Sequence, residues 1–283
     1  MESFPKISIS SINCNSLNMS SIGNTNHLLK IYGIVSLRSD IILLSDVRLC
    51  NAMGISNSAE LTGSFRTNPY CSYDMFLQST SNKRGVGILI KHSLNFSVLE
   101  EVRDAEDNFL VIKLDLEGKI IVLCAIYGPN HVHPPFFERL SNSLNRMGNY
   151  PIIVGGDWNC TVNCENNDLN DDIFNMCAAP NPRHSKLLKE LCRELNLTDP
   201  YRTKFPNRTE YTFVPKDTTK TNRSRIDFFI VSADLVSKIN KCQISPNMQN
   251  KMFDHRAVTI CFKDPPKVIK QPTISRELLK ALI

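Results

Sequence analysis

Short apolar runs recur along the whole chain, and they constrain the fold more than any other feature. The runs are rich in valine, isoleucine and phenylalanine, and Gly, Pro, Asn or charged residues bound them. They lie at residues 41–44, 86–90, 109–116, 120–126, 152–154, 228–231 and 257–262. Runs of this composition and length predict β-strands that are buried on one or both faces. None approaches the roughly 20 residues that span a bilayer, so we expect no membrane association.

Three other segments have the periodicity of amphipathic helices. Residues 185–197 place leucines on one face, with Ser185 as the candidate N-cap, and residues 134–147 begin at a proline. A third helix is expected over residues 24–38. Between two of the predicted strands, residues 117–118 form a plausible hairpin turn. Many strands with few helices predict an α/β sandwich of two sheets with outer helices.

The formal net charge is +5, and its distribution along the chain is uneven. Residues 202–225 hold seven basic and two acidic side chains, so this stretch alone carries a charge equal to that of the whole chain. Residues 157–172 hold five acidic side chains and no basic one. The basic stretch would attract a polyanion such as nucleic acid, although a solvated loop has the same composition.

Polar residues with the chemistry of metal or phosphate binding stand at the ends of the apolar runs. If the runs are strands of packed sheets, these side chains converge at one rim, where active sites are commonly built. Each residue taken alone also fits a turn, a cap or a solvated charge. The set comprises Asn13, Asn15, Asp46, Tyr127, Asp157, Asn159, Asp227, Asp254 and His255.

Together these groups suit phosphodiester hydrolysis better than acyl transfer. Carboxylates offer oxygen ligands to a hard divalent cation such as Mg²⁺, and an imidazole beside carboxylates can donate to a phosphoryl oxygen. The chain has no GxSxG elbow, no P-loop and no HExxH motif. Which carboxylate serves as the general base is left open by the sequence.

A series of blocks makes the chain recognisable. In order it reads Ile12-Asn13-Cys14-Asn15, Leu44-Ser45-Asp46-Val47-Arg48-Leu49, Ile126-Tyr127-Gly128-Pro129-Asn130, Gly155-Gly156-Asp157-Trp158-Asn159, Asp199-Pro200-Tyr201-Arg202, Tyr211-Thr212-Phe213, Ser224-Arg225-Ile226-Asp227-Phe228 and Phe253-Asp254-His255. This series resembles the endonuclease/exonuclease/phosphatase superfamily. More narrowly, it resembles the apurinic-endonuclease-like domain of non-LTR (LINE-type) retrotransposons. The resemblance spans about residues 7–263, so we assign residues 1–263 to this domain and interpret residues 264–283 as a linker toward a downstream region.

The resemblance implies a role for each matching residue. Asn13 and Asp46 hold or orient the metal, and Asp254 lies close to it. Asp157 activates or positions the attacking water, which Asn159 orients. Asp227 pairs with His255, and His255 steadies the scissile phosphate. Tyr127 lies near the leaving oxygen. The residues expected to contact phosphate or DNA are Asn15, Asn130, Thr212, Ser224, Arg202 and Arg225.

The resemblance also implies the fold, the cofactor and the partners. The expected fold is a four-layer sandwich of two packed mixed β-sheets flanked by helices. The expected activity is Mg²⁺-dependent, with Mn²⁺ as a possible substitute, and nicks one strand of double-stranded DNA. The nick leaves a 3′-hydroxyl that primes reverse transcription by a region of the same polypeptide, in the nucleus. The alternatives are an abasic-site repair endonuclease, a sugar- or lipid-phosphate phosphatase, and a catalytically silent DNA-binding module.

One position departs from the pattern of the superfamily. Asp46 stands where these proteins usually have Glu, and the missing methylene withdraws the carboxylate by about 1–1.5 Å. Because Mg²⁺ demands near-ideal octahedral distances, this change bears on the strength of the metal site. The other matching positions are intact, which favours an active enzyme.

Overall fold

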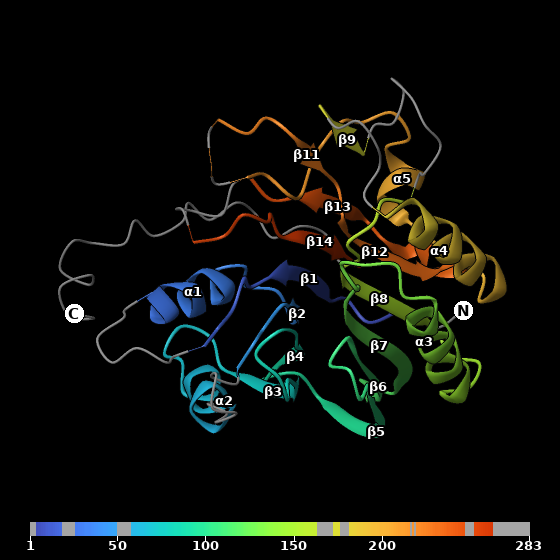
Figure 1. Ribbon diagram of the computed structural model, residues 1–283. Coiled ribbons are helices and arrows are strands. Elements are labelled where there is room, and N and C mark those ends of the chain that lie inside the picture. The colour runs from blue at the N-terminus through green and yellow to red at the C-terminus, as the bar shows by residue number, and fades with distance from the viewer. Residues whose placement is uncertain are drawn as a thin grey trace.

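Two six-stranded β-sheets pack face to face and carry helices on their outer sides, which gives the protein four layers (Figure 1). The computed structural model describes residues 4–18, 26–49, 58–162, 172–175, 181–215, 217, 219–246 and 252–262. Both sheets contain parallel and antiparallel pairs. The predicted α/β sandwich of two mixed sheets is therefore confirmed.

The first sheet has the strand order β13-β14-β1-β2-β4-β3. Its strands are β1 (Ser8–Asn13), β2 (Ile41–Ser45), β3 (Tyr73–Gln78), β4 (Val86–Lys91), β13 (Lys241–Ile244) and β14 (Val258–Cys261). β1 runs parallel to β2 and pairs Asn13 with Ser45. The residues that follow both strands therefore emerge at the same edge of the sheet.

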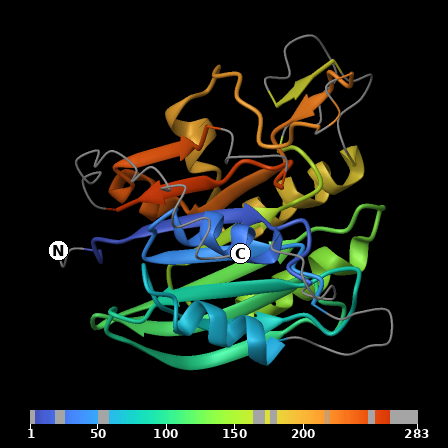
Figure 2. The same ribbon diagram turned by 90° about the vertical axis from the view of Figure 1, so that its left-hand side faces the viewer.

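The second sheet has the order β10-β12-β8-β7-β6-β5. Its strands are β5 (Phe96–Arg103), β6 (Phe109–Leu116), β7 (Lys119–Tyr127), β8 (Ile152–Asp157), β10 (Leu197–Thr198) and β12 (Asp227–Ser232). A separate two-stranded ribbon, formed by β9 (Ile173–Phe174) and β11 (Arg223–Ser224), projects from the sandwich in both views (Figures 1 and 2).

Helices close the two outer faces. α1 (Asn26–Val35) and α2 (Ser58–Arg66) cover the first sheet and lie in front of it in Figure 2, whereas α3 (Pro134–Arg146) and α4 (Pro182–Glu194) cover the second. α5 (Pro200–Lys204) and the 3₁₀ helix η1 (Ala233–Lys238) flank β12. No helix in the described ranges is long and apolar enough to cross a membrane.

Burial on both faces explains why the strands appear as unbroken apolar runs. In β2, Ile41 and Leu43 face the core between the sheets, while Ile42 and Leu44 face the helices. The residues of β7 alternate in the same way between the central core and the layer beneath α3 and α4. Side chains on successive strand residues point to opposite faces, so every position of such a strand must be apolar.

The predicted strands are confirmed, with small shifts of their ends. The hairpin turn between β6 and β7 is also confirmed, with Glu117 and Gly118 both at positive φ. The prediction of Ser185 as a helix N-cap is wrong, because α4 begins at Pro182, preceded by Asn181. The proline at the first helical turn, where its missing N–H costs nothing, was the better signal. Residues 264–283, interpreted as a linker, lie outside the described residues.

Other elements were not predicted from the sequence. These are α2, α5, the 3₁₀ helix, the short strands β9, β10, β11 and β13, and the longer strands β3 and β5. β5 lies at the edge of its sheet and none of its residues is fully buried, so it has no continuous apolar run. The short strands are too brief to show any periodicity.

The close packing of the two sheets leads to a first prediction, at Gly155 in β8. A Cβ there would lie 2.5 Å from Cε1 of Phe229 and 2.9 Å from Cδ1 of Leu43, which belong to the two different sheets. Gly155→Ala should therefore lower the free energy of unfolding by about 1–3 kcal/mol, measured by urea denaturation. A Cβ at Gly63 in α2 meets no atom within 4 Å, so Gly63→Ala should be neutral or stabilising. Equal stability of the two variants would contradict the prediction.

Candidate active site

The register of the second sheet brings three predicted site residues side by side. Parallel pairing of β7 with β8 sets Tyr127 opposite Asp157, and antiparallel pairing of β8 with β12 sets Asp157 opposite Asp227. All three side chains are nearly buried. The rim predicted from the ends of the apolar runs therefore exists at this edge.

Asn13 connects this edge to the first sheet. Its Nδ2 donates to Oδ2 of Asp157 at 2.9 Å, and its Oδ1 accepts from the backbone N–H of Asn15 at 2.8 Å. The Asn15 side chain in turn donates to Oδ1 of Asp254 at 3.2 Å. The amides therefore tie the ends of β1, β8 and the segment before β14 into one cluster.

The imidazole of His255 is held by a carboxylate. Its Nδ1 lies 2.7 Å from Oδ2 of Asp227, and its Nε2 lies 4.0 Å from Oδ2 of Asp157. Burial lowers the pKa of His255, but Asp227, Asp157 and Asp254 outweigh it and raise the pKa to about 9. The imidazole is therefore protonated at neutral pH, with Nε2–H available toward the Asp157 side.

Burial affects the pKa of Asp157 in the direction opposite to its effect on His255. Burial and the neighbouring Asp227 carboxylate raise its pKa to about 7, while His255, the backbone N–H of Asn159 and the Asn13 amide oppose the rise. A carboxyl group with this pKa takes up and releases a proton near neutral pH, which is what a general base requires. Asp157 is therefore the best placed of the carboxylates for that role.

Asp46 is present at the rim, but it already has a cationic partner. Nε and Nη2 of Arg48 donate to its two carboxylate oxygens at 2.5 Å and 2.6 Å. Burial raises the pKa of the Asp46 carboxyl, and Arg48 opposes that rise. The phenol of Tyr127 lies against the same pair, and burial together with Asp46 and Asp157 raises its pKa to about 12. The phenol therefore keeps its proton at neutral pH.

Two turns in left-handed conformation shape this part of the rim. Asn15 and Ser16 after β1, and Asp46 and Arg48 after β2, all have positive φ. Lys30 of α1 supports the first turn, because its ammonium donates to the carbonyls of Cys14, Asn15 and Ser16 at 2.5–3.0 Å. Sequence reasoning assigned no role to Lys30, since only the fold brings α1 to this turn.

Asn159 and Asn130 lie at the same edge, beyond β8 and β7. The Asn159 backbone N–H donates to Oδ1 of Asp157 at 2.9 Å, and its side-chain Nδ2 donates to the carbonyl of Gly128 at 2.7 Å. Asn130 is exposed and its side chain hydrogen-bonds to Tyr127. Contact of Asn130 with phosphate stays a prediction.

Thr212 has a different role from the predicted contact with DNA. It is fully buried, and its Oγ1 accepts the backbone N–H groups of Ile226 and Asp227 at 3.1 Å and 3.0 Å. The prediction of a DNA contact is therefore corrected, because Thr212 fixes the start of β12 from inside. Ser224 is paired through its backbone with Phe213, which also bridges to His255. A DNA contact by Ser224 stays a prediction.

Arg225 is also corrected. Its side chain is 1% exposed, with Nε 2.6 Å from Oδ1 of Asp172 and Nη2 2.8 Å from Oδ2 of Asp199. Arg202 forms an ion pair with the same Asp172 and donates to the carbonyl of Arg208 at 2.8 Å. Asp172, from the unexplained acidic stretch, thus neutralises two arginines that were expected to bind DNA. Residues 163–171 of that stretch lie outside the described residues.

The β9–β11 ribbon adds surface groups that sequence reasoning missed. Phe174 is 50% exposed, packs against the ring of Tyr211 and carries the guanidinium of Arg223 over its face. Burial and the nearby charge of Arg223 lower the pKa of Arg256, the residue after His255. Glu210 opposes this lowering, so an acidic side chain already lies near the two arginines.

The donor set fits a divalent cation. Ligand atoms of Asp157, Asp227 and His255 lie within 4.8 Å of one another, and Oδ1 of Asp227 is buried without a hydrogen-bond partner among the described residues. Four carboxyl groups, of Asp46, Asp157, Asp227 and Asp254, gather here with two cationic groups, Arg48 and His255. Carboxylate oxygens are the ligands that a hard divalent cation prefers.

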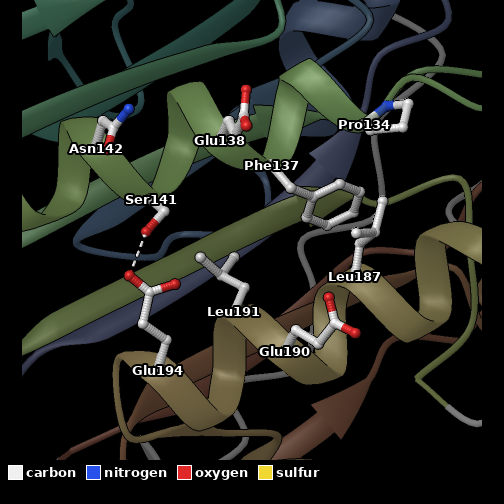
Figure 3. A pocket seen from close by; sticks show the side chains of 9 residues that line it. All are labelled: Pro134, Phe137, Glu138, Ser141, Asn142, Leu187, Glu190, Leu191 and Glu194. Atoms are coloured by element: carbon white, nitrogen blue, oxygen red, sulfur yellow. Dashed lines mark hydrogen bonds between the residues drawn. The ribbon is translucent and has the colours of Figure 1, made fainter.

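A groove between α3 and α4 is separate from this site (Figure 3). Its floor is apolar, formed by Phe137, Leu187 and Leu191, and glutamates line its sides. Ser141 donates to Glu194 across it at 2.9 Å. None of the predicted site residues lines this groove, so the chemistry belongs to the rim.

Comparisons with known proteins agree with this geometry. Residues 10–247 match the model of the Endonuclease/Exonuclease/phosphatase family. The chain is 25% identical over 191 residues to the Transposon TX1 uncharacterized 149 kDa protein of Xenopus laevis, a match that covers 66% of this chain and 14% of that protein. The chain therefore corresponds to a small part of that relative.

Solved structures share the fold at low sequence identity. An AP endonuclease from Leishmania major has a TM-score of 0.69 and 16% identity, covering 92% of this chain and 88% of that one. An AP endonuclease from Archaeoglobus fulgidus has a TM-score of 0.67 and 18% identity, covering 90% and 99%. A 3′-5′ exonuclease from Neisseria meningitidis has a TM-score of 0.65 and 16% identity, covering 91% and 100%.

The second prediction concerns the pKa of His255. Asp227→Asn removes the nearest carboxylate, so the pKa should fall from about 9 toward the ordinary value of 6.5, as followed by NMR titration of the ring. The stability that the charged pair contributes is fully present below pH 6.5 and is lost as the pH rises through about 9. Asp74→Asn, beside the exposed His92, should leave the His255 titration unchanged. An unchanged His255 pKa in Asp227→Asn would refute the assigned cause.

Proposed function

Because the chain belongs to the endonuclease/exonuclease/phosphatase family, we propose that it is a metal-dependent endodeoxyribonuclease that nicks one strand of double-stranded DNA. The observation that carries the proposal is the continuous set of hydrogen bonds and charges from Asn13 through Asp157 to His255 and Asp227. This set supports the proposal because a proton acceptor and a proton-bearing imidazole lie side by side at one edge of the sheet.

The chemistry is hydrolysis of a phosphodiester. Asp157 takes a proton from a water molecule, whose oxygen bonds to phosphorus as the bond from phosphorus to O3′ breaks. His255 donates through Nε2–H to a non-bridging oxygen, where negative charge develops. Tyr127 keeps its own proton and donates a hydrogen bond to the departing O3′, which takes up a proton from solvent water as the bond breaks. The products are a 3′-hydroxyl and a 5′-phosphate.

A divalent cation, Mg²⁺ or Mn²⁺, would be held by Asp46, with Asn13 and Asp254 beside it, next to the group of Asp157, Asp227 and His255 whose ligand atoms lie within 4.8 Å of one another. When bound, it would neutralise charge on the phosphate and on the departing oxygen. His255 is a weaker candidate ligand than its position suggests, because its raised pKa keeps the imidazole protonated at neutral pH. Its role is to donate a hydrogen bond to the phosphate.

Duplex DNA is favoured over a small phosphate ester by the groups beside the site. Arg223 and Arg256 offer positive charge next to His255, and the exposed Phe174 offers a face for stacking on a base. Phosphate contacts supply affinity and position, and aromatic contacts fit bases at an opened or distorted step.

The relationship to a transposon protein supports a role in retrotransposition. In this role the 3′-hydroxyl left by the nick primes reverse transcription, carried out in the nucleus by a region of the same polypeptide. The competing function is repair at abasic sites, which the same chemistry would serve. The two differ in substrate, because a repair enzyme cuts abasic duplex much faster than intact duplex.

The third prediction tests the activity with supercoiled plasmid. The protein should nick it with Mg²⁺ and leave it intact with EDTA, and His255→Ala should slow nicking by about 100- to 1000-fold because a donor to the developing charge is lost. The matched control is His92→Ala, which removes an exposed histidine paired with Asp74 and should nick like the wild type.

Other substrates separate the competing functions in the same assay. Strong preference for an abasic duplex would favour repair, and turnover of a small phosphomonoester would favour a phosphatase. Binding of plasmid without nicking would show a silent DNA-binding module and would overturn the proposed enzyme.

The fourth prediction concerns Phe174. Phe174→Ala should weaken duplex binding by about tenfold in a gel-shift titration, because one aromatic contact with a base is lost. Leu99→Ala is a matched control, since Leu99 on β5 is 49% exposed and Phe174 is 50% exposed. It should bind DNA like the wild type. Equal binding by both variants would show that the ribbon does not contact DNA.

A further inference from the structure

Both oxygens of the Asp46 carboxylate are occupied by one arginine. Nε of Arg48 donates to Oδ1 at 2.5 Å and Nη2 donates to Oδ2 at 2.6 Å, a parallel two-bond arrangement. This geometry is the strongest form of a carboxylate–guanidinium pair, and it takes up one lone pair on each carboxylate oxygen. Asp46 is thus ion-paired in the position where a ligand for the cation is expected.

The backbone holds the two residues in this geometry. Asp46 and Arg48 are both at positive φ, and the N–H groups of Val47 and Arg48 donate to the carbonyls of Gly85 and Arg84. The turn is therefore fixed by the loop before β4. Asp46 has a short side chain, which keeps its carboxylate close to this turn and within reach of Arg48.

The two side chains differ in exposure. The Asp46 side chain is 4% exposed, whereas that of Arg48 is 37% exposed. Asp46 cannot leave the rim, but the guanidinium can swing into solvent by rotation of its own side chain. Movement of Arg48 would release its two hydrogen bonds to the carboxylate without any change in the strands, while the phenol of Tyr127 stays beside Asp46.

We propose that Arg48 is a resident counter-cation of Asp46, which a divalent ion must displace before it can bind that carboxylate. The proposal rests on the proposed function for the identity of the ion. Its consequence is that Arg48 weakens the affinity of the free protein for divalent cations and keeps the buried carboxylate neutralised when no metal is bound. Arg48 is thereby a determinant of metal affinity at this site.

The charged groups of the site also favour displacement of Arg48 by the divalent ion. With Arg48 in place, the site holds four carboxyl groups and two cationic groups, Arg48 and His255, and without Arg48 only His255 remains. A divalent ion that enters while Arg48 stays on Asp46 meets a guanidinium within the same cluster. The divalent ion and the guanidinium are both positively charged, and they repel each other strongly in a site of low dielectric constant. Replacement of Arg48 by the ion is therefore favoured over binding of both cations at Asp46.

The test measures Mn²⁺ binding to the whole chain without DNA, from the loss of the electron paramagnetic resonance signal of free Mn²⁺. Arg48→Gln should lower the dissociation constant for Mn²⁺ by about tenfold or more, because the competing cation is gone. Arg48→Lys keeps the charge without the two-bond geometry and should lie between the wild type and Arg48→Gln. Circular dichroism confirms that each variant is folded.

Two further variants show whether the change in Mn²⁺ affinity arises at Asp46. Asp46→Asn combined with Arg48→Gln should lose the gain in affinity, since the carboxylate that the ion gains is absent. Arg146→Gln removes a guanidinium paired with Glu100 at the end of α3, away from the rim, and should bind Mn²⁺ like the wild type. These controls separate a local effect from a general change in net charge.

Unchanged Mn²⁺ affinity in Arg48→Gln would overturn the proposal, and so would a gain that survives Asp46→Asn. Plasmid nicking by the wild type with Mn²⁺ reports on the proposed function independently. Nicking without a change in affinity would remove the inference and keep the nuclease. Tighter binding in a protein that never nicks would keep the inference and remove the nuclease.

Discussion

The packing of two β-sheets over one shared apolar core is the constraint on which the site depends. Because the inner strands are buried on both faces, the polar groups of the site stand where strands end. β1 and β2 leave the first sheet at the edge where β7 and β8 leave the second, and β12 begins there. The hydrogen bond from Asn13 to Asp157 joins the two sheets at this rim. The site is therefore a consequence of strand register, and its atoms are positioned by rigid elements.

Electrostatics then decides what the rim can do. Carboxylates this close and this buried repel one another, and each is stabilised by a different partner. Asp227 has the imidazolium of His255 at 2.7 Å and Asp46 has the guanidinium of Arg48, whereas Asp157 has two N–H donors and the same imidazolium at the longer distance of 4.0 Å. Asp157 is accordingly the group whose pKa burial raises to about 7. The least neutralised carboxylate is also the one best suited to accept a proton.

The sequence predicted the strands and most of the rim because both follow from local patterns. Apolar runs mark strands, and chemically capable residues at their ends mark the site, so Asn13, Tyr127, Asp157 and His255 needed no knowledge of distant contacts. Arg225 was misjudged because its partners, Asp172 and Asp199, lie 53 and 26 positions away in sequence. Phe174 was missed because a two-residue strand has no pattern. Arg48 stood inside a recognised block, but its bond to Asp46 depends on the left-handed turn.

The structure also changes the meaning of the basic stretch 202–225. Arg202 and Arg225 are neutralised by Asp172 and Asp199, and Arg208 pairs with Glu210. A large share of the formal positive charge therefore stabilises the segment that leads into β12. Among the described residues of the stretch, Lys220 and Arg223 are exposed basic side chains, and Arg223 belongs to the ribbon. Because the salt dependence of DNA binding scales with the phosphates that are neutralised, it should be shallower than seven free basic side chains would give. Affinity would then depend more on shape and stacking at the ribbon than the composition indicates.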